Sequence, residues 1–218
     1  MYALNDPQTL AERVGQLASK SSKRVVIGIA GIPGSGKTTL TAKMCELMNQ
    51  KGFKTQGISQ DGFHYYRQQL YLMKNSREAI ERRGAPFTFD AVKFLRLVEK
   101  FNDPQYKDTE IMAPSFDHSK KDPIENDVVI SPDTKIIFVE GNYLALKDPV
   151  WKELGGYFDE IWRLEVSMEE AKERLVERHL TAGICATREE AQRRAEDNDL
   201  VNGVYILENS VPATISIS

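Results

Sequence analysis

A buried strand that runs into a glycine-rich loop and then a helix is the feature that most constrains this chain. Residues 24–31 read RVVIGIAG, a β-branched and almost continuously apolar run, as expected of a strand buried on both faces of a parallel sheet. The next segment, GIPGSGKT at 31–38, matches the phosphate-loop pattern G-x-x-x-x-G-K-[ST]. Apolar residues then recur at helical spacing over 37–50. Strand, loop and helix in this order are the context that supports the motif, so we expect a nucleotide phosphate to bind here.

The chemistry of such a loop assigns a role to each residue type. Glycines let backbone N–H groups close around a phosphate, and the helix N-terminus adds partial positive charge. Lys37 is expected to reach the β and γ oxygens, and Thr38 to offer its hydroxyl to Mg²⁺. The predicted ATP-binding residues are Gly31, Ile32, Pro33, Gly34, Ser35, Gly36, Lys37, Thr38 and Thr39. ATP and Mg²⁺ are therefore the predicted cofactors.

Strands and helices alternate along the rest of the chain. Buried or short strands are predicted at 55–59, 135–139 and 160–166, with an outer strand at 213–217. The predicted helices follow Asp6-Pro7 and cover 76–83, 90–101, 168–181 and 187–200. This alternation predicts an α/β fold with three α/β/α layers around a mainly parallel sheet. We expect a single domain over 1–218, with a helical lid at about 168–200.

Composition narrows the functional classes. The chain has 218 residues, with 29 Lys plus Arg against 32 Asp plus Glu, and a formal net charge of −3. This balance argues against a nucleic-acid-binding protein. No run approaches the ~20 apolar residues of a membrane span, so no membrane partner is expected. Cys45 and Cys185 form neither a disulfide framework nor a metal-binding spacing, which favours a cytoplasmic location. The oligomeric state is left open, a homodimer included.

Two carboxylates are expected at the carboxyl edge of the sheet, where open α/β folds bind ligands. Asp61 follows the strand at 55–59, and it is either the base that takes a proton from an attacking hydroxyl or the cap of the next helix. Glu140 ends the strand at 135–139 as a single carboxylate at a strand end. The chain has no Asn-Lys-x-Asp segment, which disfavours a GTPase.

Several ordered segments resemble the P-loop kinases of small-molecule hydroxyls, the family that includes uridine kinase, phosphoribulokinase and type I pantothenate kinase. Besides the phosphate loop, they are DGFH (61–64), RRGAPFTFD (82–90), APSFDHSKKDP (113–123) and VEGNYLAL (139–146). The overall impression is of a uridine-kinase-like branch, to which RRAEDNDLVNG (193–203) adds. The resemblance implies ATP-dependent phosphoryl transfer to a small-molecule hydroxyl acceptor.

The resemblance also implies residue roles. Asp61 becomes the catalytic base, and Arg174 and Arg178 become the lid residues that neutralise the transferring phosphate. Glu140 becomes an active-site acid or an acid associated with Mg²⁺, directly or through water, and Lys37 of the phosphate loop is the predicted catalytic cation. The candidate acceptor-site residues are His64, Tyr65, Arg83, Asp117, His118, Glu140 and Asn142. Uridine kinases tend to carry Asp-Ser-Phe-Tyr in place of DGFH, and pantothenate kinase Tyr-Ser-His where this chain has Phe-Asp-His. These departures leave open whether the acceptor is a nucleoside, a pantothenate-like or a sugar-like molecule.

Each weaker feature also has a structural interpretation. Arg174 and Arg178 could form surface pairs with the many glutamates of their helix, and His64 could pack beside Tyr65. His179 is expected to be solvated. A regulatory ATPase without a small-molecule acceptor is the alternative function.

Overall fold

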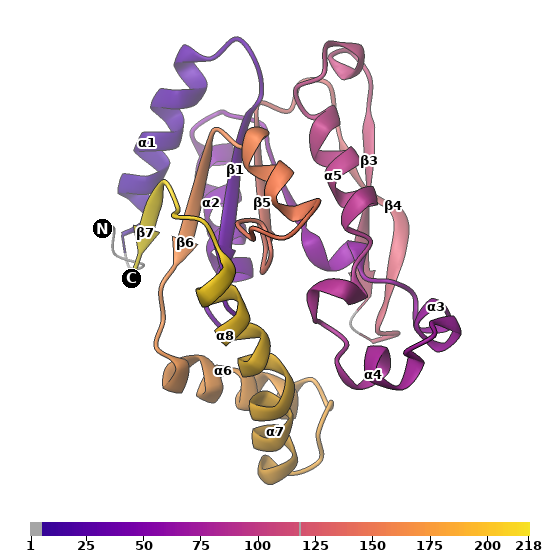
Figure 1. Cartoon of the computed structure of the whole chain (residues 1–218). Helices are drawn as coiled ribbons and strands as arrows, with labels where there is room; N and C mark the ends of the chain where they lie inside the picture. The colour runs from indigo at the N-terminus through magenta and orange to yellow at the C-terminus, as the bar shows by residue number, and fades with distance from the viewer. Residues whose placement is uncertain (1–5, 118) are drawn as a thin grey trace.

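The computed structural model describes residues 6–117 and 119–218. At its centre lies a five-stranded sheet between two layers of helices (Figure 1). The strands are β1 (Val25–Gly31), β2 (Thr55–Ser59), β5 (Ile136–Gly141), β6 (Glu160–Leu164) and β7 (Ile215–Ile217). Their order is β2-β5-β1-β6-β7, and every neighbouring pair is parallel. The three-layer α/β/α fold is thus confirmed, and β7 is an edge strand as expected.

Alternate side chains of the central strands enter two separate apolar cores. The helices of the two layers are α1 (Pro7–Lys20) and α2 (Lys37–Gln50) on one face, and α5 (Ala91–Lys100), the short η4 (Trp151–Gly156) and α8 (Leu200–Asn209) on the other. Ile27 and Ile29 of β1 pack toward α1 and α2, whereas Val26 joins the core of α5 and α8. Each fully buried aliphatic side chain contributes roughly 1.5–3 kcal/mol, so the sheet holds both layers in place.

A two-stranded antiparallel hairpin stands beside α5 (Figure 1), formed by β3 (Ile111–Asp117) and β4 (Asp122–Ile130). The sequence pattern did not predict β4, because five of its nine residues are exposed and its apolar run covers only the last three residues. The hairpin packs closely on the loop after β2. A Cβ on Gly62 would lie 2.5 Å from the Pro114 carbonyl oxygen, so glycine is required where the two segments meet.

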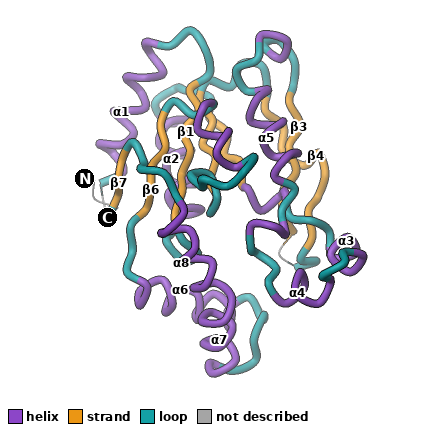
Figure 2. The backbone as a smooth tube through the Cα atoms, viewed as in Figure 1, coloured by secondary structure: helices purple, strands orange, loops and turns teal. Residues whose placement is uncertain are grey.

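The remaining helices lie beyond the end of the sheet at which β6 ends (Figure 2). They are α3 (Arg67–Leu72), α4 (Ser76–Glu81), α6 (Met168–Thr181) and α7 (Arg188–Arg194). The predicted helix over 187–200 is not one α-helix: α7 gives way to a π-helical turn, η5 (Ala195–Asp199), which continues directly into α8. Within the residues described, no helix is both long and apolar enough to cross a bilayer.

Candidate nucleotide and acceptor site

The phosphate loop connects β1 to α2 through backbone conformations that favour glycine. Gly34 has φ 81° and Gly36 has φ 95°, both in the left-handed region. Gly36 is the residue directly before α2, and among the described residues no side chain caps that helix start. A Cβ on Gly31 would lie 2.6 Å from the hydroxyl oxygen of the buried Ser35. The loop therefore presents uncapped backbone N–H groups at a helix N-terminus, the arrangement that binds phosphate.

Lys37 lies across this loop as a buried cation. Its side chain is 8% exposed, and Nζ donates to the Ile32 carbonyl oxygen at 2.9 Å. Burial lowers the pKa of Lys37 to about 8, although the negative charges of Glu140 and Asp61 act in the opposite direction. A buried ammonium that hydrogen-bonds a loop carbonyl is stabilised by an anion entering the loop.

The two candidate carboxylates lie at the ends of neighbouring strands. Ser59 of β2 pairs in register with Glu140 of β5, and its hydroxyl donates to Glu140 Oε1 at 2.5 Å. Thr38 lies near the same carboxylate and acts to lower its pKa. Burial, followed by the nearby charge of Asp61, raises the pKa of Glu140. Thr38 and Glu140 therefore offer two oxygen ligands beside a carboxylate pair whose repulsion a cation would relieve.

Asp61 lies in the short η1 turn (Gln60–Phe63) that follows β2, and its side chain is 45% exposed. The Ser59 hydroxyl accepts from the Asp61 N–H and caps this turn. The Asp61 carboxylate is thus not used as the cap and faces solvent near Lys37 and Glu140, whose pKa values it influences.

His64 is mostly packed rather than exposed. Its side chain is 10% exposed, and its ring lies 3.9 Å from that of Phe89 and 5.0 Å from that of Phe116, measured between centroids. Its Nδ1 lies 2.9 Å from the Asp61 carbonyl oxygen. The histidine therefore holds the segment after Asp61 against aromatic rings of the segments 82–90 and 113–123. These two segments, together with 61–65, are called the acceptor side, after their predicted role.

Arg83 joins the hairpin to the same segment. One guanidinium nitrogen, Nη2, donates to Asp122 Oδ1 at 2.9 Å and to the Tyr65 carbonyl oxygen at 3.0 Å, while Nη1 donates to the Lys121 carbonyl oxygen. The guanidinium also lies over the Phe116 ring, 5.7 Å from its centroid. Burial is the main cause that lowers the pKa of Arg83. Most of its donors are thus engaged by the protein, and Tyr65 contributes its backbone to that contact.

The hairpin tip uses Asp117 in a turn. Its Oδ1 accepts from the Ser119 N–H at 2.8 Å and the Ser119 hydroxyl at 2.5 Å, and from the Lys120 N–H at 3.1 Å. The Ser119 hydroxyl is the main cause that lowers the pKa of Asp117 to about 2. His118, a candidate acceptor residue, lies outside the described residues. Asn142 is half-buried just after β5.

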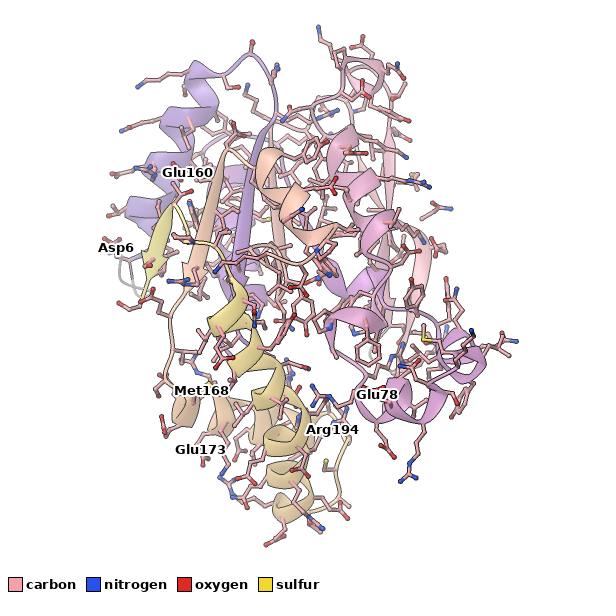
Figure 3. All side chains as sticks on the ribbon, viewed as in Figure 1. Asp6, Glu78, Glu160, Met168, Glu173 and Arg194 are labelled. Atoms are coloured by element: carbon pink, nitrogen blue, oxygen red, sulfur yellow. The ribbon has the colours of Figure 1, made fainter. Side chains whose placement is uncertain are left out.

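Helix α6 brings Arg174 to the phosphate loop. Its Nη1 donates to the Gly34 and Ser35 carbonyl oxygens at 3.4 Å each, and Nη2 pairs with Glu170 at 2.5 Å. Arg178 is exposed one turn further along, and its charge contributes to lowering the pKa of Lys37. Figure 3 labels Met168 at the start of this helix, on the side of the molecule opposite α4. Both arginines therefore lie on the helix that packs on the loop.

His179 corrects the sequence prediction. The sequence predicts a solvated side chain, but this one is 3% exposed and its Nε2 lies 2.8 Å from Asp199 Oδ2. The physical reason is the apolar face of the helix, because His179 continues the buried row of Leu175 and Val176 toward η5.

Sequence reasoning also missed the contacts of a set of buried or half-buried polar groups beneath the acceptor side. They are the buried Gln60, Tyr143, Asn198 and Asn202, and the half-buried Arg82. Their partners come from distant segments, so no local pattern marked them. The signal that the sequence carried was the resemblance of the segments 82–90, 139–146 and 193–203, which contain all of these residues except Gln60.

The fold and the site together define a P-loop kinase. Residues 26–155 match the family model described as "Phosphoribulokinase / Uridine kinase family". Since this match covers more than half of the chain, the protein belongs to that family.

Relatives agree with this assignment. The chain is 40% identical over 198 residues to a Schizosaccharomyces pombe protein named "Putative uridine kinase C227.14", covering 90% of this chain and 83% of that one. It is 41% identical over 153 residues to the "ATP-dependent kinase-like protein notR'" of Aspergillus versicolor, covering 70% and 89%. A solved structure described as a "putative fructose transport system kinase" from Silicibacter sp. TM1040 has a TM-score of 0.86 and 30% identity, covering 96% and 98%.

The family match and these similarities establish the class of activity. The protein is a small-molecule kinase that uses ATP, as the resemblance implied.

Proposed function

We propose that this kinase transfers the γ-phosphoryl group of ATP to a hydroxyl of a nucleoside, a pantothenate-like molecule or a sugar-like molecule. The observation that carries the proposal is the proximity of Lys37 at the start of α2, Glu140 at the end of β5 and Asp61 in the turn after β2, beside a loop built to bind phosphate. The partial exposure of Asp61 supports its contact with an acceptor, and the burial of Lys37 and Glu140 supports their role on the nucleotide side.

In this mechanism each residue acts on charge or position. Asp61 accepts the proton of the attacking hydroxyl, and Lys37 neutralises charge on the phosphate oxygens. Arg174, and Arg178 one turn on, stabilise the equatorial oxygens when the lid over about 168–200 closes and excludes water. In-line positioning supplies most of the rate.

Mg²⁺ fits the donors that are present. Thr38 and Glu140 would hold it, together with phosphate oxygens and water, and it would neutralise charge on the phosphates. In the described residues no group of three or more His, Cys, Asp or Glu side chains could hold a metal by itself. Mg²⁺ bound through one carboxylate and substrate phosphates requires no such group.

The acceptor is the open part of the proposal. The name of the S. pombe relative suggests a nucleoside, and the description of the Silicibacter structure suggests a sugar. A single-domain organisation and a cytoplasmic location stay predictions from the sequence, and a homodimer stays open.

The test is ATP consumption by the purified protein with Mg²⁺ against nucleosides, pantothenate, pentoses, hexoses and glycerate. Lys37→Ala serves as the blank. We expect one acceptor to raise turnover above the background with water and to gain one phosphate by mass. Slow hydrolysis that no acceptor changes, but that a protein partner stimulates, would favour the regulatory ATPase instead.

A further inference from the structure

A series of hydrogen bonds, joined to one another by short stretches of backbone, leads from the lid helix α6 to the residue next to Asp61. Its first link is the buried pair of His179 and Asp199, whose Nε2 and Oδ2 atoms lie 2.8 Å apart. His179 is 3% exposed and Asp199 16%. Because α6 also carries the Arg174 contacts to the phosphate loop, this pair connects the nucleotide side to the π-helical turn η5.

The second link joins η5 and the start of α8 to the segment 82–84. The Asn198 side-chain amide donates to the Arg83 carbonyl oxygen at 3.0 Å. Arg82 Nη2 donates to Asn202 Oδ1 at 2.8 Å. Asn198 and Asn202 are 5% and 2% exposed. Two buried asparagines therefore fix the backbone and side chain of a segment far away in the sequence.

The third link reaches η1, the turn that holds Gln60 and Asp61. The Tyr143 hydroxyl donates to the Gly84 carbonyl oxygen, and the Tyr143 N–H donates to Gln60 Oε1 at 3.2 Å. Both Tyr143 and Gln60 are buried. Gln60 directly precedes Asp61, so the series ends beside the proposed base.

The π-helical turn makes the second link possible. Such a turn inserts an extra residue into a helix, and π-bulges are frequent at functional sites. In η5, Asn198 contacts the 82–84 segment while its neighbour Asp199 contacts His179. The turn η5 is thereby hydrogen-bonded both to α6 and to the segment 82–84.

Resting on the proposed function, we propose that His179 and Asn202 are positioning residues that couple nucleotide binding at the phosphate loop to the ordering of the acceptor segment 82–90. When a nucleotide draws α6 onto the loop through Arg174, the series transmits this position to Gly84 and Gln60. The acceptor then meets a segment already ordered, which lowers the entropic cost of its binding. Coupling of this kind is a free energy shared by the two sites.

The experiment measures hydrogen exchange of the Gly84, Ala85 and Thr88 amides, with and without a non-hydrolysable ATP analogue and Mg²⁺. In the wild type we expect the analogue to slow exchange at these amides by about fivefold or more. His179→Phe should lose this response, and His179→Gln, whose amide can donate to Asp199, should recover it. Arg82→Met and Asn202→Ala test the second link in the same way. The matched control is Arg188→Gln, which removes exposed pairs to Glu173 and Glu177 on the same lid helices.

Kinetics give a second readout once an acceptor is found. His179→Phe should raise the acceptor KM about fivefold or more while the affinity for the analogue changes little. A merely structural role would lower stability without this split between the acceptor KM and the affinity for the analogue.

The outcomes separate the two proposals. If the analogue binds the wild type but does not change exchange at 84–88, or if His179→Phe and Arg82→Met both retain the change, the coupling is wrong and the kinase proposal stands. If the analogue binds neither the wild type nor Lys37→Ala, the proposed function fails and the coupling fails with it. A variant that does not fold is replaced by its partner across the same link, Asp199→Leu for His179→Phe, because leucine cannot hydrogen-bond His179.

Discussion

The phosphate loop and the acceptor side differ in the sequence separation of the contacts that stabilise them. In the loop, Lys37 bonds the Ile32 carbonyl five residues away, and Ser35 packs under Gly31. On the acceptor side, Arg83 reaches Asp122 and Arg82 reaches Asn202, 39 and 120 residues away. A local motif can therefore specify the loop, whereas the acceptor side exists only once the whole chain has folded. Substitutions in the two regions should accordingly separate nucleotide binding from acceptor transfer.

Asp61→Asn should give the largest loss of phosphoryl-transfer rate and should leave nucleotide binding unchanged. Without a base the transfer rate should fall by roughly 10²–10⁴-fold, while the affinity for an ATP analogue stays near the wild-type value, because Asp61 is half-exposed and lies outside the loop. Single-turnover transfer and analogue titration measure the two quantities.

The control for this substitution is Asp108→Asn, an exposed carboxylate on the loop before β3. Full transfer by Asp61→Asn with intact analogue binding would remove Asp61 as the base.

Lys37→Met should lower both the transfer rate and the affinity for the nucleotide, in contrast to Asp61→Asn. Removing one preorganised cation from a transition state typically costs roughly 10²–10³-fold in rate, and here the affinity for the nucleotide should fall as well. Lys43→Met, an exposed lysine of the same helix, is the matched control. If Lys37→Met weakened only acceptor binding, the separation between the two regions would not hold.

The same difference between local contacts and contacts of distant residues explains which features the sequence could predict. The sheet strands and the loop were readable because burial on both faces leaves a continuous apolar run, as in β1, and because 31–38 is one contiguous motif. The edge position of β7 followed from its alternating pattern. The hairpin strand β4 escaped because its residues are mostly exposed.

The acceptor side is predictable in its residues but not in their contacts. Arg83 is a candidate from the sequence, yet its bonds to Asp122 and to the Tyr65 carbonyl depend on a hairpin that no local pattern indicates. The charged neighbours of His179 in sequence predict a solvated side chain, whereas helix geometry buries it against Asp199. A polar residue on a buried helix face is recognised only when the packing of that helix is known.

Gly34→Ala tests how the loop and the lid helix share space. A Cβ on Gly34 would lie 2.6 Å from the Ala171 carbonyl oxygen of α6, and φ is 81°. We expect a loss of about 1–3 kcal/mol in the free energy of unfolding, together with weaker nucleotide binding. Urea unfolding and analogue titration measure both.

Gly52→Ala is a control that isolates the backbone cost. Gly52 has φ 86°, and a Cβ at this position would meet open space, with no neighbouring atom of the described residues within 4 Å. The substitution should cost about 1–2 kcal/mol and leave nucleotide binding unchanged. Equal losses of stability and unchanged binding in both variants would mean that α6 can shift without consequence for the loop.

The smallest effect concerns pH. Burial lowers the pKa of Lys37 to about 8 from its usual value of 10.5, so between these values the unfolded chain binds more protons than the folded chain. The free energy of unfolding of the wild type minus that of Lys37→Met should therefore be constant below pH 8. Above pH 8 this difference should rise with pH, by at most about 1.4 kcal/mol per pH unit. Urea unfolding of both proteins between about pH 7 and 9.5 measures the difference, in which other titrating groups cancel.

Adding an ATP analogue to this measurement connects the pH effect to the loop itself. Phosphate charge beside Nζ favours the protonated lysine, so the rise above pH 8 should shrink when the analogue is bound. An unchanged rise would place the bound phosphates away from Lys37 and would contradict its role in the nucleotide site. The same titration of Asp61→Asn should still respond to the analogue, because the carboxylate acts from the acceptor side while the phosphate charge comes from within the loop.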